Sequence, residues 1–258
     1  MRFYHAFWRI FQQTELARLK IGFYCVICAA AGSSDCDLCD GCESLLQRCR
    51  HTDRAGVCSR LCVACGREYF GPWAKLRAQC GECRSRKGPF SAIVAPYRYA
   101  FPLEHLVAAM KYRDQRNLAR PLGTLLARAV VCSRDAPLPS LLVPVPLHRT
   151  RLQHRGYNQA ADIARWCAHE LGLTYSATAV HRQVDTGSLA GLSRAERQHQ
   201  IIGAFRAGNR VVGQHVAIVD DVLTTGSTAR ELARELYDTG AEEVELWVLA
   251  RTSSSRSG

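Results

Sequence analysis

Residues Val216–Thr228 constrain the fold of this chain more than any other stretch. The run Val216-Ala-Ile-Val219 is apolar and mostly β-branched, which predicts a buried strand. Asp220 and Asp221 follow the run directly, and the polar loop Thr224-Thr-Gly-Ser-Thr228 comes next. Apolar residues then recur at helical spacing up to a glycine. The predicted unit is a strand with an acidic tip, a hydroxyl-rich loop and a helix.

The chemistry of this unit indicates a ligand site. In open α/β sheets, ligands bind beyond the carboxyl ends of the strands. A loop that opens a helix offers free N–H groups and a positive dipole, which favour a phosphate, and Gly226 lets the backbone approach it closely. Two carboxylates would repel that phosphate unless they bind a ribose diol or a hydrated Mg²⁺. The alternative is a buried strand that ends in an Asp-rich turn before a capped helix.

Strands and helices alternate from Phe90 onward, which predicts an α/β fold with a mostly parallel sheet and helices on both faces. If the strands at 141–146 and 216–219 run parallel, the loops after them share one edge of the sheet. The polar segment 182–200 is either a mobile flap over that edge or a solvated loop. The remaining expected strands are 92–95, 97–99 and 244–250, and the expected helices are 102–114, 118–132 and 160–171.

Cysteines dominate the region before residue 90. Eleven of the thirteen cysteines lie between residues 25 and 83, and four C-x-x-C pairs can be drawn among them. Two such pairs form one tetrahedral Cys₄ site, so we expect a double zinc ribbon with two structural zinc ions. A redox C-x-x-C is the alternative for any single pair, and Cys36 competes for a place in the second pair. The expected ligands are Cys25, Cys28, Cys39, Cys42, Cys62, Cys65, Cys80 and Cys83.

These patterns predict two domains, an N-terminal helix with a Cys-rich zinc-ribbon domain over residues 1–89 and the α/β domain over residues 90–258. The amphipathic helix is expected near residues 3–16 and should pack on its own domain. No window reaches the ~20 apolar residues of a membrane span, and the many cysteines favour a reducing compartment. We therefore expect a soluble, cytoplasmic protein. The Ser-rich tail is expected to be disordered.

The chain carries a formal net charge of +11, from 34 basic and 23 acidic side chains. The excess is spread along the chain, and only four of the basic residues are Lys. A basic surface suits a polyphosphate ligand or nucleic acid. A GC-rich genome would also enrich Arg, so the composition alone does not decide between these explanations.

The stretch 216–228 resembles the phosphoribosyl pyrophosphate (PRPP) signature of type I phosphoribosyltransferases. That pattern is an apolar run, two acidic residues, an apolar pair and then Thr-Thr/Gly-Gly-Ser/Ala-Thr. The resemblance implies that Asp220 and Asp221 face the ribose and serve catalysis, and that residues 224–228 wrap the 5′-phosphate. The implied PRPP-binding residues are Asp220, Asp221, Val222, Leu223, Thr224, Thr225, Gly226, Ser227 and Thr228.

A second basic stretch follows the strand at 141–146. Residues His148–Gly156 are expected to form a cationic loop at the same edge of the sheet. The pyrophosphate end of PRPP, with its Mg²⁺, would bind there through charge-assisted hydrogen bonds. The expected contacts are Lys111, Arg149, Arg151 and Arg155. The alternative is a solvated basic loop.

Several motifs together resemble the ComF (competence protein F, GntX-like) family, which joins a Cys-rich zinc region to a phosphoribosyltransferase-like domain. The resemblance implies a role in natural transformation and in handling single-stranded DNA, but it implies no acceptor substrate. Departures occur at Leu189, at Gln200 and at Gly22-Phe-Tyr-Cys25, where the family usually has Gln, Asn and a Phe-Pro-x-Cys entry. The matching motifs are 38–46, 61–66, 80–83, 110–113, 143–149, 155–159, 192–197, 203–205 and 219–226.

Two functions follow from this reading. One is an enzyme that transfers the phosphoribosyl group of PRPP with Mg²⁺, for which no general base stands out by spacing. The other is a non-catalytic module that binds PRPP or single-stranded DNA and docks a DNA-uptake helicase through its zinc region. The intact PRPP loop favours the first function, whereas the basic charge and the zinc ribbons favour the second.

Overall fold

The computed structural model describes residues 24–32, 36–49, 59–70, 79–83, 88–134, 136–185 and 200–252. The chain divides into two compact units, residues 1–43 and 44–258. Predictions for the N-terminal helix, for most of the segment 182–200 and for the Ser-rich tail fall outside the described residues. Among the described helices, none is long and apolar enough to cross a membrane.

In the unit of residues 1–43, the described residues form cysteine-bearing turns around a short helix. Tyr24 and Ala31 make an antiparallel bridge that closes the first turn. Helix α2 (Asp40–Ser44) begins immediately after Cys39 and carries Cys42 on its buried side. The turns therefore bring cysteines from both ends of this segment toward one point.

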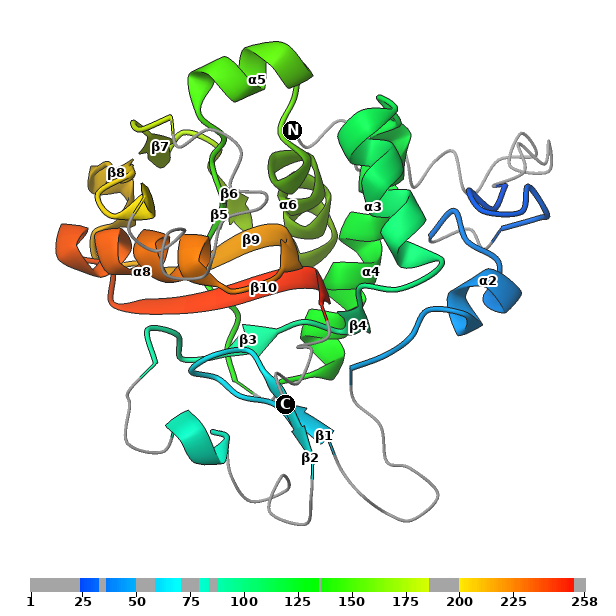
Figure 1. The fold of residues 1–258 in the computed structure, drawn as a ribbon, viewed down its shortest axis with the longest axis horizontal. Helices are drawn as coiled ribbons and strands as arrows, with labels where there is room; N and C mark the ends of the chain where they lie inside the picture. Colours follow the sequence, from blue (N-terminus) through cyan, green and yellow to red (C-terminus); the bar gives the residue numbers. More distant parts are fainter. Residues whose placement is uncertain are drawn as a thin grey trace. The chain divides into compact units, whose positions relative to one another are not determined.

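The larger unit is built on a parallel sheet with the strand order β3-β10-β9-β5-β6, and β4 also pairs with β10 (Figure 1). All of these pairings are parallel, which confirms the predicted α/β architecture. The strands are β3 (Ile93–Val94), β4 (Tyr97–Arg98), β5 (Leu141–Pro144), β6 (Thr174–Tyr175), β9 (His215–Leu223) and β10 (Glu243–Arg251).

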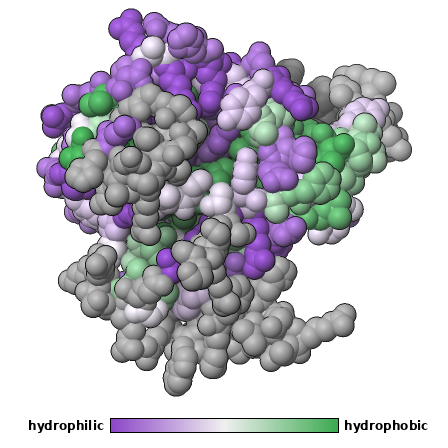
Figure 2. All heavy atoms as spheres, in the orientation of Figure 1, coloured by the Kyte–Doolittle hydropathy of each residue, from purple (hydrophilic) through white to green (hydrophobic). Residues whose placement is uncertain are grey.

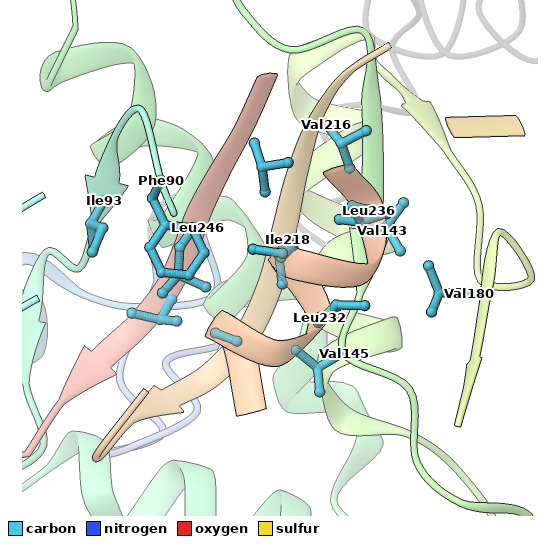
Figure 3. Close-up of a cluster of buried hydrophobic side chains, with 14 of the residues drawn as sticks. Phe90, Ile93, Val143, Val145, Val180, Val216, Ile218, Leu232, Leu236 and Leu246 are labelled. Atoms are coloured by element: carbon cyan, nitrogen blue, oxygen red, sulfur yellow. The ribbon is translucent and has the colours of Figure 1, made fainter. Parts of the chain in front are cut away.

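Helices cover both faces of the sheet. On one face, α8 buries Leu232 and Leu236 against Ile218 and Leu246 of the central strands (Figure 3). On the other face, α4 packs on α6 and β10, and α6 packs on β5 and β9. This two-sided burial explains the nearly continuous apolar runs of β9 and β10. The helices are α3 (Leu103–Tyr112), α4 (Ala119–Cys132), α5 (Arg149–Arg155), α6 (Gln159–Leu171) and α8 (Ser227–Thr239), with 3₁₀ turns at Arg116–Leu118 and Asn209–Val211.

Two small antiparallel pairs accompany the sheet. Strands β1 (Ser59–Leu61) and β2 (Glu68–Phe70) flank a cysteine-bearing turn, and Cys80 is followed by a 3₁₀ turn at Gly81–Cys83. Strands β7 (Val180–Arg182) and β8 (Phe205–Ala207) form the second pair. The Glu235 carboxylate anchors this pair to α8 by accepting a 2.9 Å hydrogen bond from the Ala207 N–H.

The expected loop at 148–156 is wrong, because residues 149–155 form helix α5. His148 caps the helix by accepting a hydrogen bond from the Thr150 N–H at 3.4 Å, and Gly156 ends it with φ +80°. The expectation of a loop rested on charge alone, whereas Arg, Leu and Gln are all good helix formers. Helix α5 lies at the top of Figure 1, and the surface at the same place in Figure 2 is mostly hydrophilic.

Candidate active site

The strands β5 and β9 end at the same edge of the sheet. Leu141–Pro144 pairs with Val216–Val219 in parallel, and the Val145 N–H extends the ladder by donating to the Val219 carbonyl at 2.9 Å. The chain leaving β5 toward α5 and the chain leaving β9 toward α8 therefore start side by side. This is the position at which open α/β sheets bind their ligands.

The acidic pair belongs to β9 itself. β9 continues through Asp220, Asp221 and Val222 to Leu223, so the carboxylates lie inside the strand and do not form its tip as expected. Strand β10 pairs alongside up to Leu223, which explains why β9 outlasts its apolar run. Asp221 is buried, and Asp220 is partly buried and accepts a hydrogen bond from the Asp221 N–H at 2.9 Å.

Lys111 provides the counter-charge for this pair. Its Nζ lies 2.7 Å from Asp221 Oδ2. Burial alone would lower the pKa of Lys111, but the carboxylate of Asp221 outweighs it and the pKa is raised. Burial and the charge of Asp221 raise the pKa of Asp220 to about 7, although Lys111, the Asp221 N–H and Arg182 act in the opposite direction. Asp220 therefore changes protonation state near neutral pH.

The motif Tyr157-Asn-Gln159 fixes the end of α3 from which Lys111 projects. The Tyr157 hydroxyl and Gln159 Nε2 both donate to the Met110 carbonyl, the second at 3.3 Å. Asn158 caps α6 and donates from Nδ2 to the Val145 carbonyl at 2.9 Å. These residues hold α3, α6 and the end of β5 together, so their part is to position Lys111 beside the acidic pair.

The loop after β9 has the geometry of an anion site. Gly226 adopts φ +71°, which favours glycine, and α8 begins at the next residue. Thr225 Oγ1 lies 3.0 Å from Ser227 Oγ and accepts from the Ser227 N–H at 3.4 Å, so it covers the free end of the helix. Arg230 donates to the Thr225 carbonyl at 2.6 Å. A phosphate that displaced the Thr225 hydroxyl would meet N–H groups, hydroxyls and a nearby cation.

The predicted basic residues fall into two places. Arg149 and Arg151 are exposed on α5. Arg155 is partly buried, donates to Gln159 Oε1 at 2.9 Å, and its guanidinium carbon lies 5.8 Å from the ring centroid of Tyr112. Lys111 forms an ion pair with Asp221 and therefore lies at the acidic pair.

Two basic residues of the site escaped the sequence analysis. Arg182 of β7 influences the acidic pair, because its charge opposes the raised pKa of Asp220. Burial and the charge of Arg151 in turn lower the pKa of Arg182. Arg230 lies one turn into α8. The charge of each residue was visible in the sequence, but no local pattern linked either one to the end of β9.

Two cysteine clusters have the geometry of metal sites. The first cluster consists of Cys25, Cys28, Cys39 and Cys42, and the second cluster of Cys62, Cys65, Cys80 and Cys83; within each, all Sγ atoms lie within 4.8 Å of one another. The Sγ–Sγ distances are 3.6 Å for Cys28–Cys39 and 3.9 Å for Cys65–Cys80. Zn–S bonds of about 2.3 Å in a tetrahedron imply separations of about 3.8 Å, so both clusters fit a zinc ion. The first cluster contains Cys42 and leaves the competing Cys36 outside.

Comparisons with known proteins agree with this arrangement. The family model of the phosphoribosyl transferase domain matches residues 153–257. DNA utilization protein YhgH of Salmonella typhi is 34% identical over 212 residues, which cover 78% of this chain and 92% of that protein. Competence protein F of Haemophilus influenzae is 32% identical over 225 residues, which cover 83% of this chain and 90% of that protein.

A solved structure of glutamine PRPP amidotransferase from B. subtilis overlaps with half of this chain and 25% of its own, at 21% identity and a TM-score of 0.35. This overlap is too small to say anything about the site. The match with the two named relatives extends over nine-tenths of their length. The chain therefore belongs to the family of competence protein F and DNA utilization protein YhgH, with a phosphoribosyltransferase domain in its C-terminal part.

Proposed function

We propose that this protein binds PRPP with Mg²⁺ at the C-terminal edge of its sheet and transfers the phosphoribosyl group to an acceptor. One observation carries the proposal: the acidic pair of β9 and the hydroxyl loop that opens α8 follow each other on one continuous element. Residues 224–228 bind the 5′-phosphate, and Asp220 and Asp221 bind the ribose hydroxyls. Lys111 and the cations of α5 bind the pyrophosphate.

The reaction is a displacement at the anomeric carbon of the ribose. The bond to the pyrophosphate oxygen breaks, a bond to the acceptor nucleophile forms, and the nucleophile loses its proton. Charge builds up on the leaving pyrophosphate, so cations placed there stabilise the transition state more than the ground state. Mg²⁺, which arrives with PRPP, neutralises part of the pyrophosphate charge. The two carboxylates orient the ribose and favour the positive charge that develops on it.

Calorimetry and isotope exchange test this proposal on the same preparation. PRPP with Mg²⁺ is expected to bind the purified protein with one site per chain. Labelled pyrophosphate is then expected to exchange into PRPP when a matching nucleobase acceptor is present. Binding without exchange for any base would leave a PRPP-binding module, and the absence of PRPP binding would contradict the proposal.

A second candidate function is a module that binds single-stranded DNA. It is favoured by the exposed Arg149 and Arg151 on α5, which would track a phosphate backbone. The names of the relatives, DNA utilization protein and competence protein F, point in the same direction. In this scheme the zinc region docks a DNA-processing partner such as a helicase. Titration with single-stranded DNA, alone and with PRPP, tests whether the two ligands use one surface or two.

The zinc ions belong to the same proposal. Each cysteine cluster holds one Zn²⁺ through four thiolates, as its Sγ separations support. In a closed four-thiolate site the metal is structural and takes no part in the transfer. Its contribution is to fix turns that the few apolar residues of this region would not fix alone.

A further inference from the structure

Leu223 lies between two loops that are far apart in the sequence. A side-chain carbon added to Gly66 would lie 2.4 Å from Leu223 Cδ2, and one added to Gly226 would lie 3.2 Å from Leu223 Cδ1. The backbone of the cysteine-bearing turn at 62–66 therefore packs on one methyl group of Leu223, and the loop that opens α8 packs on the other. Leu223 is buried and belongs to the main hydrophobic core.

The second cysteine cluster determines where Gly66 lies. The Gly66 N–H donates to the Cys62 carbonyl at 2.7 Å, and the Cys62 N–H donates to the Arg67 carbonyl at 2.9 Å. Gly66 itself adopts φ +68°. Gly88 also packs against this turn, so tightly that a carbon added to it would lie 2.4 Å from Ala64 Cα. The turn is thus a compact unit whose two cysteines, Cys62 and Cys65, are ligands of the second cluster.

Hydrogen bonds from the end of β10 reinforce this contact. Arg251, the last residue of β10, pairs with Leu223 in the parallel ladder, and its guanidinium donates to the Gly66 carbonyl. The Thr252 N–H donates to the Leu223 carbonyl at 3.1 Å. Arg251 itself is buried. Both the side chain and the carbonyl of Leu223 are therefore held in place. Arg251, which pairs with Leu223, also holds Gly66.

We propose that zinc in the second cluster positions the PRPP loop through Leu223, an inference that rests on the proposed function. Bound zinc fixes the turn 62–66, the turn fixes the Leu223 side chain, and Leu223 supports Gly226 at the start of α8. Loss of the metal loosens the turn, because Cys62 and Cys65 are then no longer tied to the other two thiolates of the cluster. The packed contacts then pass this change to the loop that binds the 5′-phosphate.

Removing the metal from one cluster at a time tests the inference. The variant Cys80→Ser with Cys83→Ser takes two ligands from the second cluster and leaves the sequence of the turn 62–66 unaltered. The matched control, Cys25→Ser with Cys28→Ser, does the same to the first cluster. Each double variant is expected to lose one equivalent of zinc. Hydrogen exchange of the Thr224–Thr228 amides is expected to accelerate, and PRPP affinity to fall about tenfold, only when the second cluster is altered.

Exchange and affinity that match the parent in the second-cluster variant would overturn the inference. The exchange measurement needs no PRPP, so it remains decisive even if the parent does not bind PRPP and the proposed function fails. Conversely, normal PRPP binding with unchanged exchange in both variants would keep the proposed function and remove this coupling.

A glycine pair covers the case in which the second-cluster variant does not fold. Gly66→Ala keeps all eight cysteines and drives a methyl group into Leu223, whereas Gly172→Ala has the same backbone strain at φ +66° with open space around it. We expect Gly66→Ala alone to weaken PRPP binding, with both zinc ions retained. Adding Leu223→Val, which shortens the side chain, should restore part of the affinity. Equal affinities for both alanine variants, or no rescue by Leu223→Val, would refute the role of Leu223.

Discussion

Lys111 Nζ lies 2.7 Å from Asp221 Oδ2, so a cation from α3 already occupies the acidic pair that PRPP is expected to use. Both side chains are mostly buried. Ribose hydroxyls or Mg²⁺ at Asp221 would compete with this ion pair. Binding of PRPP therefore requires Lys111 either to share Asp221 with the ligand or to turn toward the pyrophosphate. The second movement would reconcile its observed partner with the pyrophosphate contact inferred from the sequence.

Replacing Lys111 tests how much this pair contributes. Lys111→Met leaves Asp221 buried without its cation, and a hydrogen bond to a charged group contributes about 1.5–3 kcal/mol. We expect the free energy of unfolding to fall by about that amount, and PRPP binding to weaken about tenfold through loss of the pyrophosphate contact. Urea denaturation and calorimetry measure the two effects. Arg113→Met, an exposed change at the residue that follows α3, is the control. A variant that is as stable as this control would show that the ion pair contributes nothing.

The raised pKa of Asp220 predicts a pH dependence of stability. The folded protein holds this proton up to about pH 7, whereas the unfolded chain releases it near 3.8. Between these values the folded state binds more protons, so stability falls as pH rises, by at most about 1.4 kcal/mol per pH unit. Denaturant midpoints of the ligand-free protein from pH 4.5 to 8 should show this decline, and Asp220→Asn should flatten it. Stability that increases over this range would contradict the assignment.

The same titration predicts the opposite trend for the ligand. The ionised form of Asp220 accepts hydrogen bonds from ribose hydroxyls at both oxygens, and the protonated form does so less well. PRPP affinity should therefore increase as pH rises through about 7, with proton release on binding near neutral pH. Calorimetry in two buffers of different ionisation enthalpy measures the released proton. Binding that is independent of pH in this range would remove Asp220 from the ribose contact.

The parts of the site that could be predicted from the sequence are those made by neighbours in the chain. Gly226 and the hydroxyls around it lie on one strand–loop–helix unit, whose order follows from apolar runs and helical spacing. The cysteine pairs were equally accessible, because a C-x-x-C turn already fixes the approach of two thiols. The juxtaposition of the chains that leave β5 and β9 followed once both strands were taken as parallel.

The remaining parts depend on contacts between distant segments. The charge of Arg182 in β7 influences Asp220, and the Gly66 turn packs against Leu223 from a region that the sequence had assigned to another domain. Neither contact leaves a periodic signal in the chain. The helix α5 was missed for a different reason, since its charge suggested a loop although its residues favour a helix.

Metal content is a direct prediction from the cysteine clusters. Two clusters of four thiolates should hold close to two equivalents of zinc in protein purified under reducing conditions. Elemental analysis with a thiol count measures this, and released zinc should leave eight additional reactive thiols. Less than half an equivalent with reduced thiols would end the zinc interpretation. One equivalent would mean that only one cluster binds metal.

The exposed arginines of α5 predict salt-sensitive binding of single-stranded DNA. Each neutralised phosphate contributes about 0.7 to the slope of log affinity against log salt. Arg149→Ala with Arg151→Ala should weaken binding and reduce this slope by about 1.4, because two phosphate contacts are lost. Arg210→Ala, an exposed arginine after β8, is the control and should keep the parental slope. Affinity that does not change between low and high salt would argue against a DNA surface.

The double variant Asp220→Asn with Asp221→Asn is the sharpest test of the site. Asn keeps the size of both side chains and removes their charge, so the strand β9 should keep its pairing with β5 and β10. Each lost hydrogen bond to a charged group contributes about 1.5–3 kcal/mol, so PRPP affinity should fall by several orders of magnitude.

Thr225→Ala provides the matched comparison within the same site. It should weaken PRPP binding less, because Ser227, the neighbouring hydroxyls and the N–H groups at the start of α8 still hold the phosphate. Circular dichroism and the denaturation midpoint establish that both variants are folded. PRPP binding by the double Asn variant at parental affinity would mean that the Asp pair is only a structural part of β9. The function of this edge of the sheet would then have to be sought in DNA binding.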